Sequence, residues 1–381
     1  MNIRLWLCSV LGVVGLAACA PRPVDVPGAA PARAAAAAPD VVRFVAGSCN
    51  DQDLSQAFWP TVDALGGEAF LALGDNIYAD VVLGQREDGS LKVSFVEDIE
   101  RVKAAYAALS ANPYWQDFAT DRVFYPTWDD HDYGLNDAGV ELSIREASQQ
   151  AFLEFWEVPS DDVRWSRDGV YSSVMTGSPG RRVQVVLLDT RSFRTALRKT
   201  DAYNAPGKER YVPTDEPGST MLGADQWAWL EQVLRQPAEV RLIVSSVQVL
   251  PVGHGFERWL NMPSEQARLM ALLDETSGER ILVSGDRHFG AIYRSEDGRR
   301  PVVELSTSSL NRSFGGGDET APLRVGPWVS EVNAGTIDID WRSRTVTLQL
   351  VRLDEGHEGE VAHAVTWAMD VASGGGENGG Q

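Results

Sequence analysis

Cysteine is nearly absent from this sequence, which has three cysteines in 381 residues. Cys8 and Cys19 lie within the first twenty residues, so the rest of the chain holds one thiol, Cys49, and cannot form an internal disulfide. A free cysteine is commonly a small buried apolar residue. The alternative is that Cys49 binds a metal ion, which requires other ligands beside it.

Positively charged residues are also scarce, with 34 Lys and Arg against 54 Asp and Glu and a formal net charge of −20. A surface this acidic argues against non-specific binding to nucleic acid, which depends on positive charge. It does not exclude a phosphate-containing substrate, because bound metal ions can reverse the sign of the charge locally.

The apolar run at the start of the chain, residues 5–16, is too short to span a membrane. Because Arg4 precedes it, the segment is typical of a secretory signal. The run ends in Leu16-Ala17-Ala18-Cys19, which looks like a bacterial lipobox with Cys19 as the lipidated mature N-terminus. Signal cleavage without lipidation is the alternative, and the position of Cys19 directly after the run favours lipidation.

The residues around this signal predict the domain organisation. Residues 1–19 form the lipoprotein signal, 20–40 an Ala- and Pro-rich tether, 41–372 one large domain, and 373–381 a disordered Gly-rich tail. Ala20 is not the Asp that commonly retains lipoproteins in the inner membrane. We therefore expect a monomer on the periplasmic side of the bacterial envelope, attached only through its lipid and in the outer membrane.

Hydrophobic patterning predicts an α/β domain. Strands are expected at 42–48, 70–73, 123–128, 170–175, 183–188, 240–250 and 281–284. Helices are expected at 54–65, 93–109, 143–157, 224–234 and 264–273, and residues 195–220 form a long loop. The last part contains only strands, at 301–306, 336–341, 345–351 and 365–370. Alternation of strands and helices favours parallel strands in a mixed sheet, or two stacked sheets flanked by helices.

Residue types that bind metals follow several of the predicted strands. They are Cys49, Asp75 with Tyr78, Asp130 with His131, Asp189, and Asp286 with His288. The carboxyl ends of parallel strands meet at one edge of a sheet, where ligands bind in α/β proteins. Capping of the next helix is the alternative for a single Asp. Several carboxylates at one edge repel each other, and bound metal ions would offset this repulsion.

These motifs carry a family resemblance. Gly74-Asp75-Asn76-Ile77-Tyr78 resembles the Gly-Asp-x-x-Tyr motif of purple acid phosphatases, and 129–132 and 285–288 resemble metallophosphoesterase histidine boxes with substitutions. Together with Gly47-Ser48-Cys49, 188–191 and the run at 222–230, they resemble the alkaline phosphatase D (PhoD-like) family in consistent order over about 42–312. The resemblance implies a four-layer α/β/β/α sandwich of two mixed sheets.

The resemblance also implies a ferric ion and calcium. A thiolate and a phenolate suit trivalent iron better than calcium, which prefers oxygen ligands. We assign Cys49, Asp75, Tyr78 and His288 to Fe³⁺. Asp75 then bridges to Ca²⁺, which Asp130 and Asp286 also bind. The histidines that usually bind the second metal of metallophosphoesterases are missing, which disfavours zinc or manganese.

The expected reaction is hydrolysis of a phosphate monoester or diester by a metal-activated hydroxide. His131 is expected to protonate the leaving oxygen or to bind a phosphate oxygen. Arg191, Arg287 and Arg312 are candidate phosphate-binding residues, because a guanidinium matches paired oxygens. The alternatives are a lipoprotein that binds phosphate or a phosphorylated ligand without turnover, and a purely structural lipoprotein.

Overall fold

The computed structural model describes residues 39–86, 88–314 and 321–369. The signal with its Cys19, nearly all of the tether and the Gly-rich tail lie outside these residues, so those assignments stay predictions. In the described part of the chain, no helix has both the length and the apolar character needed to cross a membrane.

The first of two large sheets has the strand order β14-β13-β12-β1-β2-β5. Its strands β1, β2 and β5 run parallel, and β12, β13 and β14 continue the sheet in antiparallel fashion. The bounds are β1 Val41–Gly47, β2 Ala69–Leu73, β5 Phe124–Thr127, β12 Asn333–Asp340, β13 Thr345–Arg352 and β14 Val361–Ala368.

The second sheet has the order β10-β11-β9-β8-β7-β6, with β7, β8, β9 and β11 parallel and an antiparallel strand at each edge. The bounds are β6 Ser172–Thr176, β7 Val183–Leu187, β8 Val240–Ser245, β9 Glu279–Ser284, β10 Gly290–Ser295 and β11 Val302–Thr307. The edge strand β10 was not expected from the sequence.

The two sheets pack face to face through one apolar core. Phe44 and Leu71 of the first sheet lie in the same cluster as Leu242 and Ile281 of the second. Neighbouring residues along a strand point to opposite faces, so Val45 packs instead in the cluster formed with the helices. Both faces of the central strands are buried, which explains their continuous apolar sequences.

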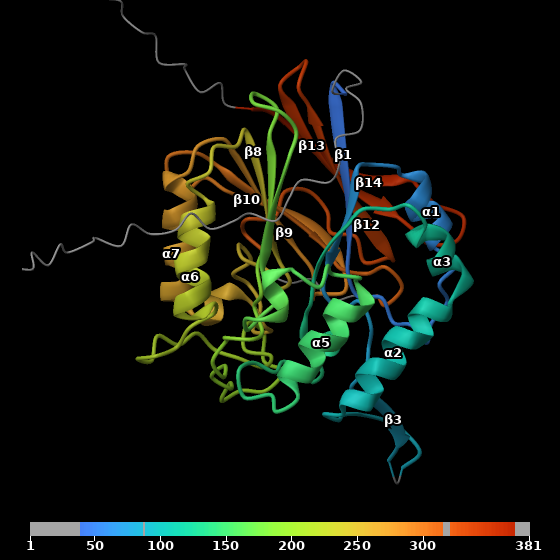
Figure 1. Cartoon of the computed structure of the whole chain (residues 1–381). Helices are drawn as coiled ribbons and strands as arrows, with labels where there is room; N and C mark the ends of the chain where they lie inside the picture. Colours follow the sequence, from blue (N-terminus) through green and yellow to red (C-terminus); the bar gives the residue numbers. More distant parts are fainter. Residues whose placement is uncertain (1–38, 87, 315–320, 370–381) are drawn as a thin grey trace, which may run out of the picture. The chain divides into compact units, whose positions relative to one another are not determined.

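Helices cover the outer face of each sheet, as Figure 1 shows. The first sheet is covered by α1 Trp59–Ala64, α2 Ile99–Ala111, α3 Pro113–Ala119 and α5 Arg145–Phe155. The second is covered by α6 Gly223–Val233 and α7 Pro263–Glu275. Three shorter helical turns are α4 Asp130–Tyr133, η1 Val163–Trp165 and η2 Trp259–Asn261. The four-layer α/β/β/α sandwich is thereby confirmed.

One expected helix was partly wrong. Residues 93–95 belong to a separate two-stranded hairpin, β3 Val81–Gln85 with β4 Leu91–Phe95, and α2 begins only at Ile99. The tight turn at Asp88-Gly89 and the alternation of residues 91–95 are hairpin signals. The expected strand at 240–250 ends at Ser245, and the expected helix at 54–65 is reduced to α1. The long loop at 195–220 contains no helix or extended strand, as expected.

Candidate metal centre and active site

Three donor atoms converge beyond the carboxyl ends of β1 and β2. The thiol of Cys49 lies 3.5 Å from Oδ2 of Asp75, and the phenol of Tyr78 donates a hydrogen bond of 3.1 Å to the same oxygen. His288, which follows β9 of the other sheet, brings a ring nitrogen within 4.8 Å of ligand atoms of Cys49 and Asp75. Two sheets thus supply one buried group of sulfur, oxygen and nitrogen donors.

The backbone at these residues is unusual. Cys49, Asp75, Asp286 and His288 have φ values of 58°, 49°, 70° and 58°. Residues other than glycine seldom adopt this left-handed conformation, and such strained residues cluster at active sites. Four of the six predicted metal ligands therefore follow their strands with the chain bent in the same unfavourable way.

Asp75 is held in place by its neighbours in the chain. Gly74 has φ +101°, and a Cβ added there would lie 2.6 Å from both the backbone nitrogen and the Cβ of Asp129. Only glycine therefore fits where the loop after β2 meets the loop after β5. Asp132 joins the same loops, because its carboxylate accepts hydrogen bonds from the backbone nitrogens of Asn76, at 3.2 Å, and of Asp129, at 2.6 Å.

His288 is oriented as a ligand through its other nitrogen. Its Nδ1 lies 2.6 Å from the backbone carbonyl of Arg312, to which it donates, and this leaves Nε2 as the nitrogen that can bind a cation. Burial lowers the pKa of His288 to about 3, so the imidazole is neutral at physiological pH. A neutral imidazole is the form that binds metals.

Asp130 links this group to a second cluster of acids. Ligand atoms of Asp75, Asp130 and His131 lie within 4.8 Å of one another, and so do those of Asp130, Asp137 and Glu257. The carboxylate of Asp130 also accepts backbone hydrogen bonds from His131, at 3.0 Å, and from Asp137, at 2.7 Å. Asp286 belongs to none of these groups of ligand atoms. Burial and the negative charges of Asp129 and Asp130 raise the pKa of its carboxyl group.

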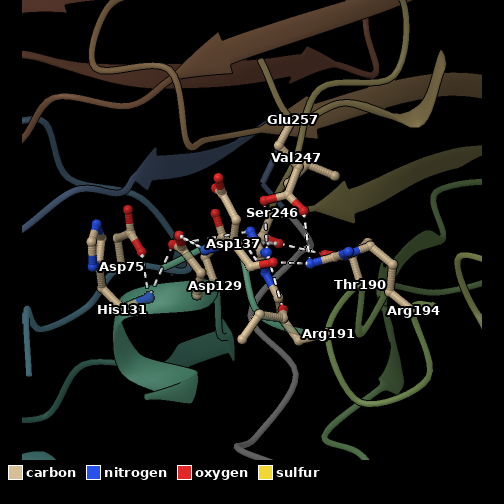
Figure 2. A network of polar contacts seen from close by, with 12 residues as sticks. Asp75, Asp129, His131, Asp137, Thr190, Arg191, Arg194, Ser246, Val247 and Glu257 are labelled. Carbon is tan, nitrogen blue, oxygen red and sulfur yellow. Dashed lines mark hydrogen bonds and ion pairs between the residues drawn. The ribbon is translucent and has the colours of Figure 1, made fainter. Parts of the chain in front are cut away.

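Arg191 is completely buried, and Figure 2 shows its side chain within the network formed by Asp129 and Glu257. Its Nε is 2.6 Å from Oδ1 of Asp129, and its Nη1 is 2.7 Å from Oε2 of Glu257. Arg194 pairs with the other oxygen of Glu257 at 3.0 Å. The guanidinium that we expected to bind substrate phosphate is therefore completely buried and already paired with two carboxylates of the protein.

Asp189 is likewise engaged within the protein. Its Oδ1 accepts hydrogen bonds of 2.9 Å from the backbone nitrogens of Arg191 and Ser192, and its Oδ2 accepts one of 2.9 Å from Val170. This carboxylate shapes the turn after β7 that carries Arg191.

His131 is held by a carboxylate that the motifs do not contain. Its Nδ1 lies 2.7 Å from Oδ1 of Asp80, whose Oδ2 accepts a hydrogen bond of 2.7 Å from the backbone of Asn136. Burial lowers the pKa of His131, but the charge of Asp130 and the contact with Asp80 outweigh it and raise this pKa to about 9. In the metal-free protein the imidazole is therefore protonated at neutral pH.

Two further arginines lie at the partly exposed rim. The guanidinium of Arg312 stacks 4.3 Å from the centre of the Tyr78 ring and pairs with Asp51. Arg287, between Asp286 and His288, lies 4.2 Å above the ring of Phe256. Both side chains are partly exposed, in contrast to Arg191.

The donor atoms fit bound cations. Burial and the charge of Asp130 raise the pKa of Asp75 well above its ordinary value, and burial raises that of the Cys49 thiol to about 12. Cations among these groups would remove this penalty. A thiol, a phenol, an imidazole and a carboxylate suit a transition metal, whereas the oxygens around Asp130 suit a hard cation.

Three acids near the site were missed by the motif search: Asp80, Asp137 and Glu257. Asp80 lies shortly after Tyr78, at the base of the hairpin, and Glu257 is in the loop after β8. Neither directly follows a predicted strand. Asp137 lies close in sequence to the Asp129–Asp132 motif. Its φ of 54° is a feature that only the structure reveals.

Comparisons with known proteins agree with this fold. A structure titled "Structure of PhoD" matches 89% of this chain and 73% of its own, with a TM-score of 0.67 and 15% identity. A purple acid phosphatase, PPD1 from yellow lupin (Lupinus luteus) seeds, matches 86% of this chain and 53% of its own, with a TM-score of 0.53 and 11% identity. A comparison with curated proteins found no match. The family model for PhoD-like phosphatases matches residues 44–350, and the chain therefore belongs to the PhoD-like phosphatase family.

Proposed function

We propose that this protein hydrolyses phosphate esters, monoesters or diesters, at the edge where Cys49, Asp75, Tyr78 and His288 converge. The observation that carries the proposal is the approach of a thiol and a phenol to one oxygen of Asp75, beside a neutral imidazole from the opposite sheet. Membership of a phosphatase family supports the same reaction class.

The proposed cofactors are Fe³⁺ and Ca²⁺. Cys49, Asp75, Tyr78 and His288 would hold the iron, and Asp75, Asp130 and Asp286 the calcium, with Asp75 shared. When bound, such cations neutralise charge on the phosphoryl oxygens and lower the pKa of water. The oxygen of water forms the new bond to phosphorus while the ester P–O bond breaks.

His131 is the proposed proton donor to the leaving oxygen. Asp80 fixes the tautomer and direction of the ring through Nδ1, which leaves the Nε2 proton for the substrate. With the charge of Asp130 balanced by a cation, the contact with Asp80 still favours the protonated ring. After the ester bond breaks, the proton of His131 resides on the released alcohol, and the attacking oxygen keeps its remaining proton in the phosphate product. The proton released when the water was ionised returns through solvent to His131.

The arginines divide between two proposed roles. Arg312 and Arg287 are partly exposed and contact the substrate phosphate. Arg191 is a positioning residue, because it balances the charge of Asp129 and Glu257 behind Asp130. Replacing Arg312 by methionine should raise KM for a phosphate ester, and Arg268→Met, an exposed arginine of α7, provides the control.

We further propose that the chain acts as a monomer on the periplasmic face of the outer membrane, attached through a lipid on Cys19. Support comes only from the lipobox-like sequence before Cys19. Replacing Cys19 by serine should release the protein into the soluble envelope fraction, and retention in the membrane fraction would contradict this part of the proposal.

The metal assignment is tested by metal analysis and visible absorption of the purified protein. About one iron per chain, calcium, and a phenolate-to-iron absorption band that disappears in Tyr78→Phe would support it. Tyr114→Phe, at an exposed tyrosine of α3, should keep the band. Colourless protein with zinc, manganese or no metal would contradict the iron assignment.

The activity is tested with 4-nitrophenyl phosphate and bis(4-nitrophenyl) phosphate. We expect turnover of at least one of them, and in His131→Ala we expect turnover to fall while the metal content is kept. Loss of metal in this variant would make His131 a ligand. Binding of both esters without turnover would favour a binding lipoprotein over an enzyme.

A further inference from the structure

The β3–β4 hairpin exposes a continuous apolar face. Its register pairs Val81 with Phe95, Leu83 with Val93 and Gln85 with Leu91. Directly paired residues point to the same face of an antiparallel ribbon, so five of these six side chains make one face apolar. The other face carries Val82, Gly84, Lys92 and Ser94. The exposed fractions on the apolar face reach 65% for Leu83, 59% for Leu91, 44% for Val93 and 41% for Phe95.

This apolar face begins at the candidate active site. The ring of Phe95 lies 6.0 Å from the imidazole of His131, so the face that carries Phe95 is turned towards the site. From Phe95 the strip extends outward along both strands for roughly 13 Å, at about 3.3 Å per residue. Figure 1 shows the hairpin projecting beyond α2.

The base of the hairpin is tied to the machinery around His131. Asp80, which holds the imidazole, directly precedes β3, and its carbonyl accepts a hydrogen bond of 2.9 Å from Val96 at the end of β4. Arg101 of α2 donates hydrogen bonds of 2.7 Å to the carbonyls of Ala79 and Val81. These contacts fix the start of the apolar strip relative to His131.

A second exposed aromatic residue lies across the site. Phe314 is 59% exposed, and its ring lies 4.0 Å from the ring of His288. Tyr78 lies between the two histidines, 4.2 Å from His131 and 6.2 Å from His288. Each of the two histidines therefore has a partly exposed phenylalanine ring beside it.

We propose that the site is selective for amphiphilic phosphate esters, with the phosphoryl group at His131 and Arg312 and an apolar group along the hairpin from Phe95 towards Leu91. This inference rests on the proposed phosphoesterase function and names its substrate class. Burying an apolar chain against these residues removes apolar surface of both partners from water, which favours binding.

The occupant is inferred from the size and place of the strip. Five side chains cover far less than the roughly 1,200 Å² that a stable protein–protein interface buries. The formal net charge of −20 opposes docking on an anionic bilayer. The contact between Phe95 and His131 makes the strip continuous with the site, where the substrate itself must bind.

The test compares esters that differ only in the length of the apolar group. Ethyl and octyl phosphate are assayed by phosphate release, and ethyl and octyl 4-nitrophenyl phosphate by nitrophenolate release, all below micelle-forming concentrations. In the wild type we expect kcat/KM to be about tenfold or more higher for the octyl ester than for its ethyl counterpart, given the free energy of burying several methylenes.

The hairpin variant Leu83→Ser/Val93→Ser should bring this octyl-to-ethyl ratio close to one. Using a ratio within one variant cancels any loss of folded or metal-loaded enzyme. Val163→Ser provides the matched control, because Val163 is 51% exposed in η1, outside the hairpin. The control should keep the ratio of the wild type.

Three results would overturn the inference. They are a wild-type ratio near one, a high ratio that the hairpin variant keeps, and a wild-type dimer in size-exclusion chromatography that the variant loses. Failure of the wild type to hydrolyse any of the four esters would instead overturn the proposed function. The inferred substrate class, which rests on that function, would then be wrong as well.

Discussion

Nδ1 of His131 lies 2.7 Å from a carboxylate oxygen of Asp80, whose side chain is completely buried. The two residues are 51 positions apart, and Asp80 comes from the loop that leads into the hairpin. Together with the charge of Asp130, the pair explains how a buried histidine can carry a proton at neutral pH, because the carboxylates stabilise the charged ring.

Replacing Asp80 by asparagine should lower kcat about tenfold to a hundredfold while KM changes little, since the ring loses its orienting charge. The negative charge raises the pKa of His131, so its removal should also move the alkaline limb of the pH–rate profile to lower pH. Asp117→Asn, at an exposed position of α3, is the control. A lower rate with an unchanged pH profile would indicate a purely structural role for Asp80.

Removing the metals should make stability depend on pH. In the metal-free protein, burial raises the pKa values of Asp129, Asp132 and Asp137 to about 7. Folded-state pKa values above those of the unfolded chain give stability that is present below about pH 4 and is lost as pH rises towards 7. His288, with its lowered pKa, opposes this trend but is outnumbered.

We therefore expect the free energy of unfolding of chelator-treated protein to fall by at least about 2 kcal/mol between pH 5 and 7. Urea titrations at the two pH values measure it. The metal-loaded protein should show a smaller change, because cations favour the ionised carboxylates. Equal stability of the metal-free protein at both pH values would contradict the raised pKa values.

Gly74→Ala should destabilise the protein by about 3 kcal/mol, because the new Cβ meets the backbone of Asp129 and the residue must keep a positive φ. Gly89→Ala is the matched control. Gly89 also has a positive φ, of +80°, but nothing lies within 4 Å of an added Cβ, so only the backbone cost of about 1 kcal/mol is expected. Equal losses in urea unfolding would show that the contact with Asp129 is unimportant.

Arg191→Met should destabilise the protein by about 3–5 kcal/mol, since it leaves the buried carboxylates of Asp129 and Glu257 without their partner. Arg182→Met breaks a pair with Glu239 near the surface and should cost a small fraction of that loss. Thermal or urea unfolding of both variants measures the difference. A similar loss in both would mean that the buried pair contributes no more than the surface pair.

The parts of the fold that follow from local sequence were predictable. Apolar runs such as 183–188 and 281–284 correspond to β7 and β9, and the acids and the histidine that follow β2, β5 and β9 do meet at one edge. The order of the strands was not predictable, because pairing of β1 with β12 joins residues almost 300 positions apart.

The failures have physical causes as well. The sequence around Arg191 would be the same whether its guanidinium bound a substrate or Glu257. Only the tertiary structure identifies the partner, because Glu257 comes from a loop that is distant in sequence. Asp80 has no motif around it, and its role depends on the depth at which the hairpin base is buried. The apolar residues Val93 and Phe95 also match the helical spacing of apolar residues in α2. This match concealed the alternation of apolar and polar residues along β4.

The apolar core between the sheets includes Phe44 and Ile281 but, among the described residues, none of the proposed metal ligands. Opening the ligand-bearing loops therefore does not require the sheets to separate. Hydrogen exchange should show this as two cooperative units, with loop amides exchanging through local opening and the amides of β1 and β9 only through global unfolding. A domain built in this way could open around a bound cation while its two sheets stay packed.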